Sequence, residues 1–558
     1  MILDGNSAVK RITETVDEFF KENYSDFVRG SNLSHPILPP KQSKIIHDFI
    51  WGTNRFDWFE MAVIDSPILQ RLRYLHQVGF GSYVYPSASH TRFDHSLGTS
   101  IVASKVFDNL LSRQKERLSQ IVRSVYPTLE PEKSFEKLRQ EVRLAALLHD
   151  SGHTMFSHSS ESVHSEIKLL AKAREELSAL AGKPRSTGEV LSFCISQSNF
   201  LHSLIENYED KIPKLSKPIY SKFTADLDNV SLMIIGRSKH PYLQFMGDII
   251  SSGFDADKLD YLMRDGHSTG LPVNYDLDRY LQFVSVEESQ IELLDSKSLE
   301  SVKSLYDKEM KVGDTLEEYR LKIPHNAITS MEEVVIGKFM LYGYMYHHPK
   351  IRGMDSYFER VLREEINNRK RQGEKDEDLI KWMFSINDSV IVSLPFFKKL
   401  LNDSYSSDFQ KCAYRISTRT LPREVFGING SAISHAPATM ILDFLTQLQD
   451  PDKKGIILND IETRLKGVIN NKDAIFWIDV PNAPNFEDVK NIVGRKPFYN
   501  LFPVDKWMEA YMHYTYRVRV YTFSEYVEDV IVALRQVMPK ILSVETKTME
   551  SLIRTRET

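Results

Sequence analysis

The chain has 558 residues, of which 42% are hydrophobic and 26% charged, so its composition is that of an ordinary globular protein. A formal net charge of −5 gives no bulk attraction for a nucleic-acid backbone, so any anion site must be local and no nucleic-acid partner is indicated. The two cysteines, Cys194 and Cys412, stand far apart without a Cys-x-x-Cys pair, which argues against a disulfide framework or a cysteine zinc site.

The first 40 residues are predicted to form an N-terminal extension. Residues 9–24 are polar and amphipathic, and the prolines within residues 35–40 cannot continue a helix and indicate a linker. Asp4 and the lack of an apolar stretch near the start argue against a secretory signal. The longest apolar runs, such as residues 144–148, fall far short of the ~20 residues that a membrane span needs. We therefore expect a soluble, cytoplasmic protein with no membrane partner.

Helical patterns dominate from residue 65 to about residue 270. Ser66 is placed to cap a helix that begins at Pro67, and apolar residues follow at helical spacing. Residues 283–294 alternate in polarity around a central Glu-Ser pair, which predicts a short hairpin. Residues 303–325 are charged and weakly patterned, as expected of an inserted loop or helix.

Long helices are predicted again over residues 331–363. Residues 475–480 and 516–523 are rich in β-branched and aromatic residues, which predicts strands, and residues 524–542 have the apolar spacing of a closing helix. The sequence therefore predicts a mainly α fold, with a helical core, a short β-hairpin and a small C-terminal α+β lobe. The expected parts are an extension at 1–40, a core at 41–325, a second helical region at 326–455 and a lobe at 456–558.

Histidines and carboxylates concentrate in three segments of the chain, residues 90–98, 147–161 and 254–265. His149 follows an apolar run, so a buried helix would carry His149 and Asp150 into the interior, with His153 one turn later on the face of His149. Burying so many titratable groups is costly unless a metal ion or ion partners accompany them. The three segments therefore indicate one shared site.

Two imidazoles and two carboxylates in these segments form a candidate metal site. Its members are His95, His149, Asp150 and Asp257. Nitrogen and oxygen donors without a thiolate suit Fe, Mn, Co, Ni or Zn, and they argue against a closed structural zinc site. A His-Asp dipeptide alone carries almost no information, and a lone His95 is more often a surface or a hydrogen-bonded core histidine. The combination, in this order, favours a catalytic metal.

The same four residues match the H…HD…D pattern of the HD-domain phosphohydrolase superfamily. Residues 65–79 and 92–98, and the Asp-Lys-x-x-Tyr sequence at 257–261, more closely resemble the deoxynucleoside triphosphate triphosphohydrolases. That family includes bacterial dGTPases and the vertebrate SAM-and-HD-domain enzyme. The similarity runs from about Lys44 into the C-terminal lobe, and no SAM domain fits into the first 40 residues.

The resemblance implies hydrolysis of a dNTP to a deoxynucleoside and tripolyphosphate. The four ligands would hold the metal ion, Mg would accompany the nucleotide, and metal-activated water would attack the α-phosphorus. The residues implied in catalysis are His153, His158 and Glu161. His158 would protonate the leaving 5′ oxygen, and Glu161, three residues later, would orient water or His158. The alternative for Glu161 is a solvated acid at the start of a helix.

The residues that the resemblance assigns to the substrate are Gln77, Arg92, Lys258, Tyr261, Asp265 and Tyr346. The two cations would face the triphosphate, which carries about four negative charges, and Lys338 is added as a third cation because the family has an arginine nearby. Gln77 and Asp265 would bind the 3′-hydroxyl. Tyr261 would lie beside the sugar, and Tyr346 would fill the place of a 2′-hydroxyl. The alternative for Tyr346 is an ordinary core aromatic.

A regulatory nucleotide site is implied by matches at Lys44, Asp65, Gln70 and Arg73. A carboxylate is a natural partner for the adjacent N–H donors of guanine. However, Asp65 also stands before a helix start, where the helix dipole favours an acid, and Ser285 replaces an arginine of the vertebrate enzyme. The family also implies a homo-oligomer, either a tetramer or a hexamer, and a role in dNTP supply or antiviral defence.

One position departs from the family pattern. Gly188 stands where the family usually has a second histidine after the HD motif. His164, or His153 together with Glu161, would compensate, or the protein would be a catalytically weak nucleotide sensor that signals to a partner. The other alternative is an HD phosphohydrolase acting on a different phosphoester, such as a nucleoside monophosphate.

Overall fold

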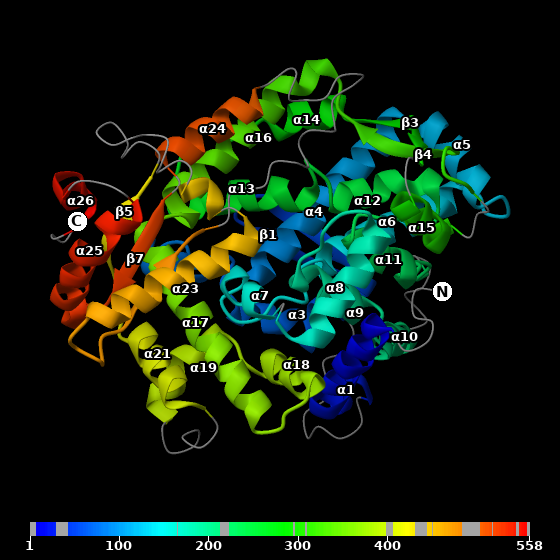
Figure 1. Ribbon diagram of the computed structural model, residues 1–558. Helices are drawn as coiled ribbons and strands as arrows, with labels where there is room; N and C mark the ends of the chain where they lie inside the picture. The colour runs from blue at the N-terminus through cyan, green and yellow to red at the C-terminus, as the bar shows by residue number, and fades with distance from the viewer. Residues whose placement is uncertain are drawn as a thin grey trace.

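The computed structural model describes residues 7–29, 43–164, 166–211, 222–293, 296–306, 310–397, 405–429, 444–448, 450–481, 503–515, 517–542 and 546–554. Helices make up most of these residues, and small antiparallel sheets lie at the periphery (Figure 1), which confirms the mainly α fold class. None of the helices in these ranges combines the length and the apolar character needed to cross a bilayer.

The described part of the N-terminal half of the chain is mainly helical. Its helices are α1 (Ala8–Arg29), α2 (Trp58–Ile64), α3 (Pro67–Gln70), α4 (Arg92–Arg113), α5 (Lys115–Val125), α6 (Pro131–Leu148), α7 (His158–His164), α8 (Lys168–Ala181), α9 (Thr187–Ser196), α10 (Asn199–Lys211), α11 (Leu227–Ile234), α12 (Gln244–Ile250), α13 (Ala256–Thr269) and α14 (Leu277–Phe283). The predicted helix start at Pro67 is confirmed, but α3 is short and continues as a 3₁₀ turn, Arg71–Tyr74. Ser66 precedes α3 without capping it, because its hydroxyl donates to Val63 O at 2.7 Å.

The helices of the C-terminal half are α15 (Ser296–Tyr306), α16 (Ile328–Leu341), α17 (Pro349–Arg371), α18 (Asp376–Ser385), α19 (Asp388–Ser393), α21 (Ser407–Ser417), α23 (Pro451–Val468), α24 (Val504–Tyr514), α25 (Val527–Leu542) and α26 (Thr546–Leu552). Helices α16 and α17 confirm the long helices predicted over residues 331–363. A π-helical turn, Tyr342–Tyr346, lies between them.

Helices α4, α6 and α13 form the centre of the molecule (Figure 1), where α4 packs against both of the others. Their apolar faces are buried, as Phe107 of α4, Ala145 of α6 and Leu259 of α13 show. The start of α4 is fixed by a capping box, in which the Asp94 carboxylate accepts from Thr91 N at 2.8 Å. This cap sets the position of the first turn of α4, which carries two of the predicted site residues.

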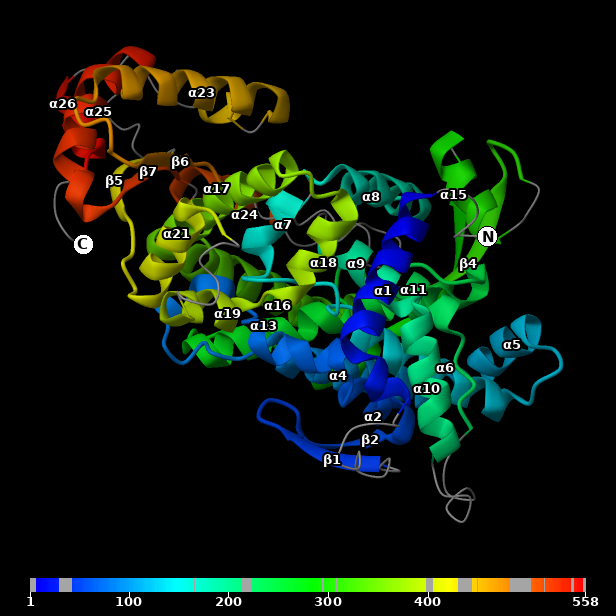
Figure 2. The same ribbon diagram turned by 90° about the horizontal axis from the view of Figure 1, so that it is seen from below.

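The helix predicted near the N-terminus is present as α1 and packs against α8, α9, α10 and α18 (Figure 2). Its residues Val9, Ile12, Val16 and Phe20 are buried in the main hydrophobic core. The linker predicted at residues 35–40 lies outside the described residues. The domain boundaries given above remain predictions.

The hairpin predicted within residues 283–294 is wrong. This segment holds one continuous strand, β3 (Ser285–Glu292), which pairs antiparallel with β4 (Thr315–Lys322) so that Ser285 faces Lys322. The alternation in polarity correctly indicated a strand. Its partner, β4, lies within residues 303–325, the segment predicted to be a loop or helix. A tight hairpin that the sequence analysis missed is formed by β1 (Ser43–Asp48) and β2 (Gly52–Asp57), which protrudes in Figure 2.

The C-terminal lobe contains a three-stranded antiparallel sheet in the order β5-β7-β6. Strands β6 (Phe476–Asp479) and β7 (Val518–Thr522) and helix α25 confirm the predicted elements of this lobe. Strand β5 (Arg423–Ile428) comes from the region expected to be helical. Cys194 and Cys412 are both buried and unpaired, as expected.

Candidate active site

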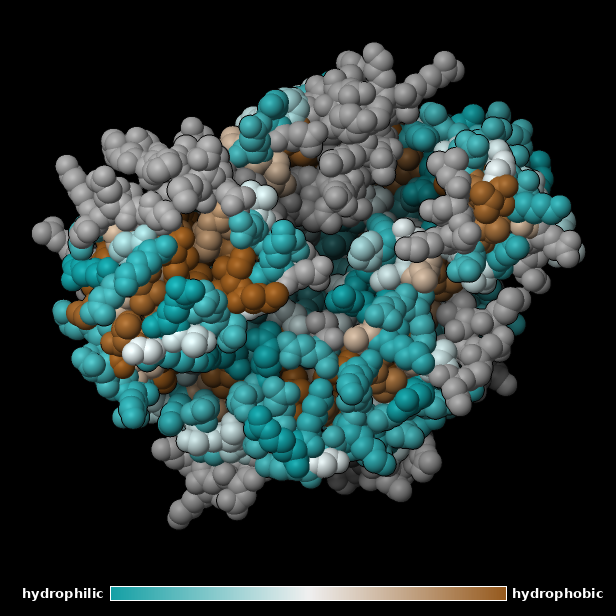
Figure 3. All heavy atoms as spheres, in the orientation of Figure 1, coloured by the Kyte–Doolittle hydropathy of each residue, from teal (hydrophilic) through white to brown (hydrophobic). Residues whose placement is uncertain are grey.

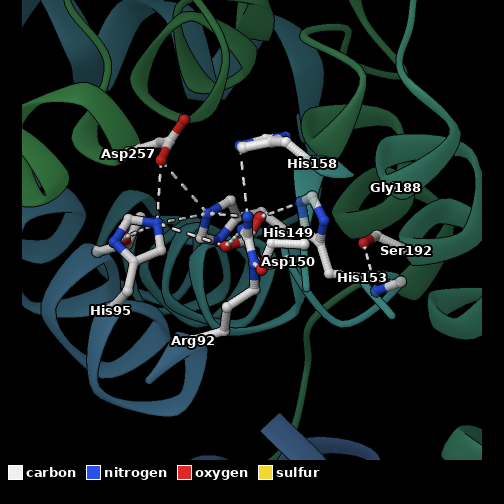
Figure 4. Close-up of polar contacts among 12 residues, drawn as sticks. Arg92, His95, His149, Asp150, His153, His158, Gly188, Ser192 and Asp257 are labelled. Atoms are coloured by element: carbon white, nitrogen blue, oxygen red, sulfur yellow. Dashed lines mark hydrogen bonds and ion pairs between the residues drawn. The ribbon is translucent and has the colours of Figure 1, made fainter. Parts of the chain in front are cut away.

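Three central helices bring His95, His149 and Asp257 together (Figure 4). His95 lies on α4, His149 directly follows α6, and Asp257 lies in the first turn of α13. His95 Nε2 lies 3.2 Å from His149 Nε2 and 3.0 Å from Asp257 Oδ1. One ligand atom of each residue lies within 4.8 Å of the other two, which is close enough for one metal ion to bind all three.

Hydrogen bonds behind the two histidine rings fix which nitrogen faces the centre. His149 Nδ1 lies 2.7 Å from Ala146 O, and His95 Nδ1 lies 2.7 Å from Asp260 Oδ2. A ring that donates from Nδ1 to such an acceptor presents Nε2 with its lone pair. Both Nε2 atoms therefore point at the same place as metal ligands would.

Asp260 is a residue of the site that the sequence analysis did not select. Its carboxylate accepts from Arg264 Nε at 2.8 Å and from the indole nitrogen of Trp51, and Arg264 also bonds Asp48 at 2.8 Å. The β1–β2 hairpin thereby braces the outer side of His95. The signal was present in the sequence, because Asp260 follows Asp257 by three residues and so lies on the same helix face.

Asp150, the fourth predicted ligand, lies beside the three but is turned toward Arg92. Its Oδ2 accepts from Arg92 Nη1 and lies 3.5 Å from His95 Nε2, while its Oδ1 lies 3.2 Å from His153 Nε2. Arg92 is buried, and its Nε donates to Ser157 Oγ at 2.8 Å. Asp150 therefore links the candidate metal site to the neighbouring histidines.

A second cluster contains His153, His158 and Glu161. His158 Nδ1 lies 2.8 Å from Glu161 Oε2, and His153 Nδ1 lies 3.7 Å from Glu161 Oε1. His158 is the first residue of α7 and is exposed to the cavity, whereas His153 is buried. The structure thus brings together all three residues predicted to act in catalysis.

In each cluster, neighbouring groups of opposite charge stabilise the ionised form of a buried residue, His95 in the first and Glu161 in the second. Burial opposes the charged form of His95, but without a metal ion the hydrogen bonds to Asp257 and Asp260 outweigh it and raise the pKa of His95 to about 10. A metal ion bound at Nε2 would replace the proton there. Burial also opposes ionisation of Glu161, yet His153 and His158 hold the pKa of Glu161 well below its usual range. Glu161 is therefore a carboxylate that can accept a proton-sharing hydrogen bond from His158.

Gly188 lies directly against the second cluster. A Cβ atom at this position would come within 2.6 Å of Glu161 Oε1 and about 3.0 Å of the His153 ring. The backbone N–H of Gly188 also donates to Glu161 Oε1 at 3.0 Å. The space that a side chain at position 188 would need is therefore taken by His153 and Glu161.

His164 is less suited to replace the missing histidine. It is buried, its Nε2 has no hydrogen-bond partner among the described residues, and burial lowers the pKa of His164 to about 3. His153, in contrast, lines the cavity and contacts Asp150. Of the two compensating histidines considered from the sequence, the geometry favours His153.

A cavity of about 1120 Å³ opens beside both clusters. The residues predicted for substrate and metal that line it are Gln77, Arg92, His149, Asp150, His153, His158, Asp257, Lys258, Tyr261, Asp265 and Tyr346. Figure 3 shows the molecule hollowed near the centre of this face, with hydrophilic side chains around much of the opening. His95 lies behind this lining with no exposed surface.

Three of the four residues predicted near the sugar, Gln77, Asp265 and Tyr346, are linked by hydrogen bonds through His90. Asp265 Oδ2 accepts from the Tyr346 hydroxyl at 2.6 Å, and Asp265 Oδ1 lies 2.7 Å from His90 Nε2. Gln77 N donates to His90 O at 3.1 Å, and Gln77 Oε1 is buried without a hydrogen-bond partner in the described structure. Gln77 therefore offers an unused acceptor, and His90 is a member of the group that the sequence analysis missed.

Arg92 and Lys258, the two predicted cations, line the cavity, whereas Lys338, the third cation considered, is not among the described residues that line it. Lys258 donates to Ser252 O at 2.7 Å and to Asp255 at 2.8 Å, at the cavity wall. Lys338 Nζ lies 6.0 Å from the centre of the Tyr342 ring, and Lys338 is absent from the described residues that line the cavity.

The four residues predicted for a regulatory nucleotide lie outside this cavity. Gln70 accepts from Arg73 Nε at 2.8 Å and donates to Ile64 O at 2.8 Å, next to Asp65. Lys44 lies on β1, opposite Phe56, and forms no hydrogen bond or ion pair with the other three within the described residues. The structure therefore groups three of the four.

Known proteins resemble this chain both in sequence and in fold. The human deoxynucleoside triphosphate triphosphohydrolase SAMHD1 is 31% identical over 272 residues, which cover 47% of this chain and 39% of that protein. The SAMHD1 homolog of Dictyostelium discoideum is 33% identical over 272 residues, which cover 48% of this chain and 44% of that protein. The chain resembles the deoxynucleoside triphosphate triphosphohydrolases. The matched region spans about two fifths of the length of these relatives, and no family model matches the chain.

A solved structure shares the fold over most of the chain. The crystal structure of a hypothetical protein from Aquifex aeolicus has a TM-score of 0.52 and 19% sequence identity, and the match covers 88% of this chain and 100% of that one. At this identity the likeness concerns the fold alone.

Proposed function

We propose that the protein is a metal-dependent hydrolase that converts a dNTP and water to a deoxynucleoside and tripolyphosphate. The observation that carries this proposal is the placement of His95, His149 and Asp257 beside a cavity that also holds His158 and Lys258. The names of the SAMHD1 relatives support the same reaction.

The residues present fit a divalent metal ion. The Nε2 atoms of His95 and His149 face each other at 3.2 Å, and each ring has a hydrogen-bond acceptor behind it at Nδ1. Two lone pairs so close together are favourable with a cation between them, and Asp257 supplies an oxygen donor. Fe, Mn, Co, Ni and Zn suit this set, with Mg accompanying the nucleotide. Such an ion supplies Lewis-acid polarisation of the phosphate and lowers the pKa of water.

The protein's own residues would bind and orient the triphosphate. Arg92 and Lys258 line the cavity from the first turns of two adjacent helices, α4 and α13, and would offset part of the phosphate charge. His158 is held through Nδ1 by Glu161, so its Nε2, 3.4 Å from Arg92 Nη2, is left for the leaving 5′ oxygen. His158 would donate the proton there, and Glu161 would stabilise the charged ring.

The missing family histidine is proposed to be replaced by His153. This ring lies between Asp150 and Glu161 and lines the cavity, beside the place where the phosphate would react. Burial and Arg92 lower the pKa of His153, which favours the neutral ring at physiological pH. A neutral ring has one N–H, which can be donated from Nε2 to Asp150 at 3.2 Å, and its Nδ1 is then left as an acceptor on the side of Glu161.

Deoxyribose selection is proposed to depend on Tyr346 and Asp265. The Tyr346 hydroxyl donates to Asp265, which places the aromatic ring at the cavity wall where a sugar hydroxyl would otherwise fit. Gln77 and Asp265 would then bind the 3′-hydroxyl, whose single proton is donated to one of them, with Gln77 Oε1 as the unused acceptor. A dNTP is therefore expected to be hydrolysed faster than the matching NTP.

Identification of the products tests the reaction. The purified protein, loaded with Mn and then with other divalent ions, is incubated with each dNTP and NTP, and the products are separated by anion-exchange chromatography. Tripolyphosphate together with deoxynucleoside supports the proposal. Orthophosphate or pyrophosphate as the primary product would favour a phosphohydrolase for another phosphoester. Tight dNTP binding without turnover would favour a nucleotide sensor, the alternative suggested by Gly188 in place of the family histidine.

Regulation is proposed at the group formed by Asp65, Gln70 and Arg73, together with Lys44. Rates are expected to rise cooperatively with an activating nucleotide, and Asp65→Ala is expected to weaken that activation while leaving metal content unchanged. Hyperbolic kinetics with every nucleotide, unaltered in Asp65→Ala, would exclude this site as an activator. Assembly into a homo-oligomer is proposed from the resemblance and is measurable by analytical ultracentrifugation.

A further inference from the structure

The turn between Asp150 and His158 has an unusual backbone. Phe156 and Ser157 have φ angles of 50° and 53°, in the left-handed region that residues other than glycine rarely adopt. Two such residues in succession are strained, and a strained segment persists only where its surroundings hold it in place. The next residue is His158, so this turn decides where the first residue of α7 is presented.

Asp388 holds the end of the turn that precedes His158. This residue begins α19, is 1% exposed, and stands 232 positions after Phe156 in the chain. Its Oδ1 accepts from Phe156 N at 2.6 Å, and its Oδ2 accepts from His76 N at 2.8 Å and lies 3.0 Å from His76 Nδ1. One buried carboxylate therefore joins the strained turn to the segment that contains His76.

Arg71 holds the start of the same turn. Its Nη2 donates to Ser151 O and, at 2.6 Å, to His153 O. Arg71 is half-buried, and burial lowers the pKa of Arg71 to about 9. Ser157 Oγ also donates to His76 O at 2.8 Å. The two ends of the turn are therefore linked to residues 71–76 by hydrogen bonds, directly or through Asp388. On the side of the turn these bonds mostly involve backbone atoms, so no sequence motif of the turn specifies them.

We propose that Asp388 and Arg71 are positioning residues that keep the strained turn in the conformation required for His158 to face the cavity. Neither residue is among the described residues that line the cavity, so each acts through the turn and not on the substrate. The inference rests on the proposed function in one respect, because it gives His158 a part in catalysis.

The test compares Asp388→Ala with Asp248→Ala. Asp248 is a matched control, because it is a buried aspartate that also accepts from a backbone N–H, that of Leu321 at 3.0 Å, and it does not line the cavity. For Asp388→Ala we expect kcat to fall about 10- to 100-fold with KM within about twofold, because a small misplacement of a catalytic group is costly. Metal content is expected to stay unchanged, and kcat of the control is expected to stay at the wild-type value.

Hydrogen–deuterium exchange provides a second readout that does not depend on turnover. Amides of residues 151–160 are expected to exchange faster in Asp388→Ala and in Arg71→Lys, while amides of α4 and α6 keep their protection. Arg71→Lys keeps the positive charge but replaces the planar guanidinium, with its several donors, by a single ammonium group. It is the variant to measure if Asp388→Ala folds poorly.

Three results would overturn the proposal. Unchanged kcat in both variants would show that the turn needs no outside support. Unchanged exchange over residues 151–160 would show the same without reference to activity. An equal loss of kcat in Asp248→Ala would show that Asp388 contributes general stability only. If the wild type hydrolyses no dNTP, the proposed function fails, and the exchange measurement alone decides the role of Asp388 and Arg71.

Discussion

The two histidine clusters of the site are held in different ways. His95, His149 and Asp257 stand on or directly beside long helices of the central core, and their positions follow from how α4, α6 and α13 pack. His158 and Glu161 stand on a seven-residue helix that follows a strained turn. The first cluster is supported by the core itself, whereas the second depends on a few contacts from distant parts of the chain.

This difference separates two properties that mutations can change independently. Damage to the first cluster should remove the metal ion and leave the fold nearly intact, because the surrounding helices carry their own apolar contacts. Damage to the second cluster, or to the residues that hold it, should leave the metal ion bound and slow the reaction. Metal content and kcat, measured side by side, therefore distinguish the two regions.

The largest effect is expected from His149→Ala. Removing this ring deletes one of three clustered donors, so the protein should lose most of its metal and its hydrolysis should become undetectable, because water activation depends on the ion. Metal content by mass spectrometry and turnover by chromatography check this. His267→Ala, an exposed histidine on α13, is the matched control. A His149→Ala protein with wild-type metal content and turnover would contradict the assignment of His149 as a metal ligand.

His158→Ala is expected to lower kcat by about 10²- to 10⁴-fold with normal metal content, the usual cost of losing a positioned acid. His164→Ala is the comparison, because His164 is buried on the same helix and is not among the described residues lining the cavity. Its kcat per folded molecule should stay near that of the wild type. Equal losses in the two variants would contradict the role given to His158.

Gly188→Ala and Gly188→His are both expected to lower kcat, by about 10- to 100-fold, because the added Cβ alone would displace Glu161 or His153. Gly455→Ala is the control, since a Cβ at that helical position meets nothing within 4 Å. Restored or increased hydrolysis in Gly188→His would instead show that the histidine is truly missing and that His153 does not replace it.

Asp260→Asn is expected to weaken metal affinity by about 10- to 100-fold, the range typical of residues that orient a metal ligand from behind. The amide keeps the size of the carboxylate but can no longer serve His95, Arg264 and Trp51 as a charged acceptor. Competition with a chelator measures the affinity. An affinity equal to that of the wild type would show that His95 needs no orienting partner.

The smallest effect is expected from Glu359→Gln, and it depends on pH. Burial raises the pKa of Glu359 from 4.5 to about 7, although Arg352 opposes this. The unfolded chain releases this proton at lower pH than the folded one, so the folded state loses relative stability as pH rises from about 4.5 to about 7. The variant should melt about 1–3 °C higher near pH 8 and unchanged near pH 4. Equal melting shifts at both pH values would contradict this.

The sequence predicted those parts of the molecule that local patterns determine. Helical patterns predicted a helical stretch over residues 65–270, which contains α4, α6 and α13, and long helices over residues 331–363, which cover most of α16 and α17. The concentration of histidines and carboxylates in three segments was enough to predict one site. These residues belong to short motifs on elements whose apolar faces leave little choice of orientation.

The β1–β2 hairpin and Asp260 were local features that the sequence analysis missed, but most of the other errors and omissions concern pairings between distant segments. The partner of β3 was β4, more than twenty residues later, and alternation in polarity does not reveal which segment completes a sheet. Trp51, Asp388 and Arg71 were missed for the same reason, since each reaches the site through one long-range hydrogen bond or two. Local patterns in the sequence do not predict contacts of this kind.

The wall of the cavity has a consequence for the order in which the protein is made. Trp477 and Asp479 of β6 contribute to that wall, and Arg352 of α17 bonds Asp479 at 2.6 Å. Strand β6 pairs with β7, the central strand of its sheet, which is translated some forty residues later. A ribosome therefore releases the segments that carry His95, His149 and Asp257 well before the cavity beside them can be closed. The nascent chain should be able to assemble this cluster first and complete the cavity only near the end of synthesis.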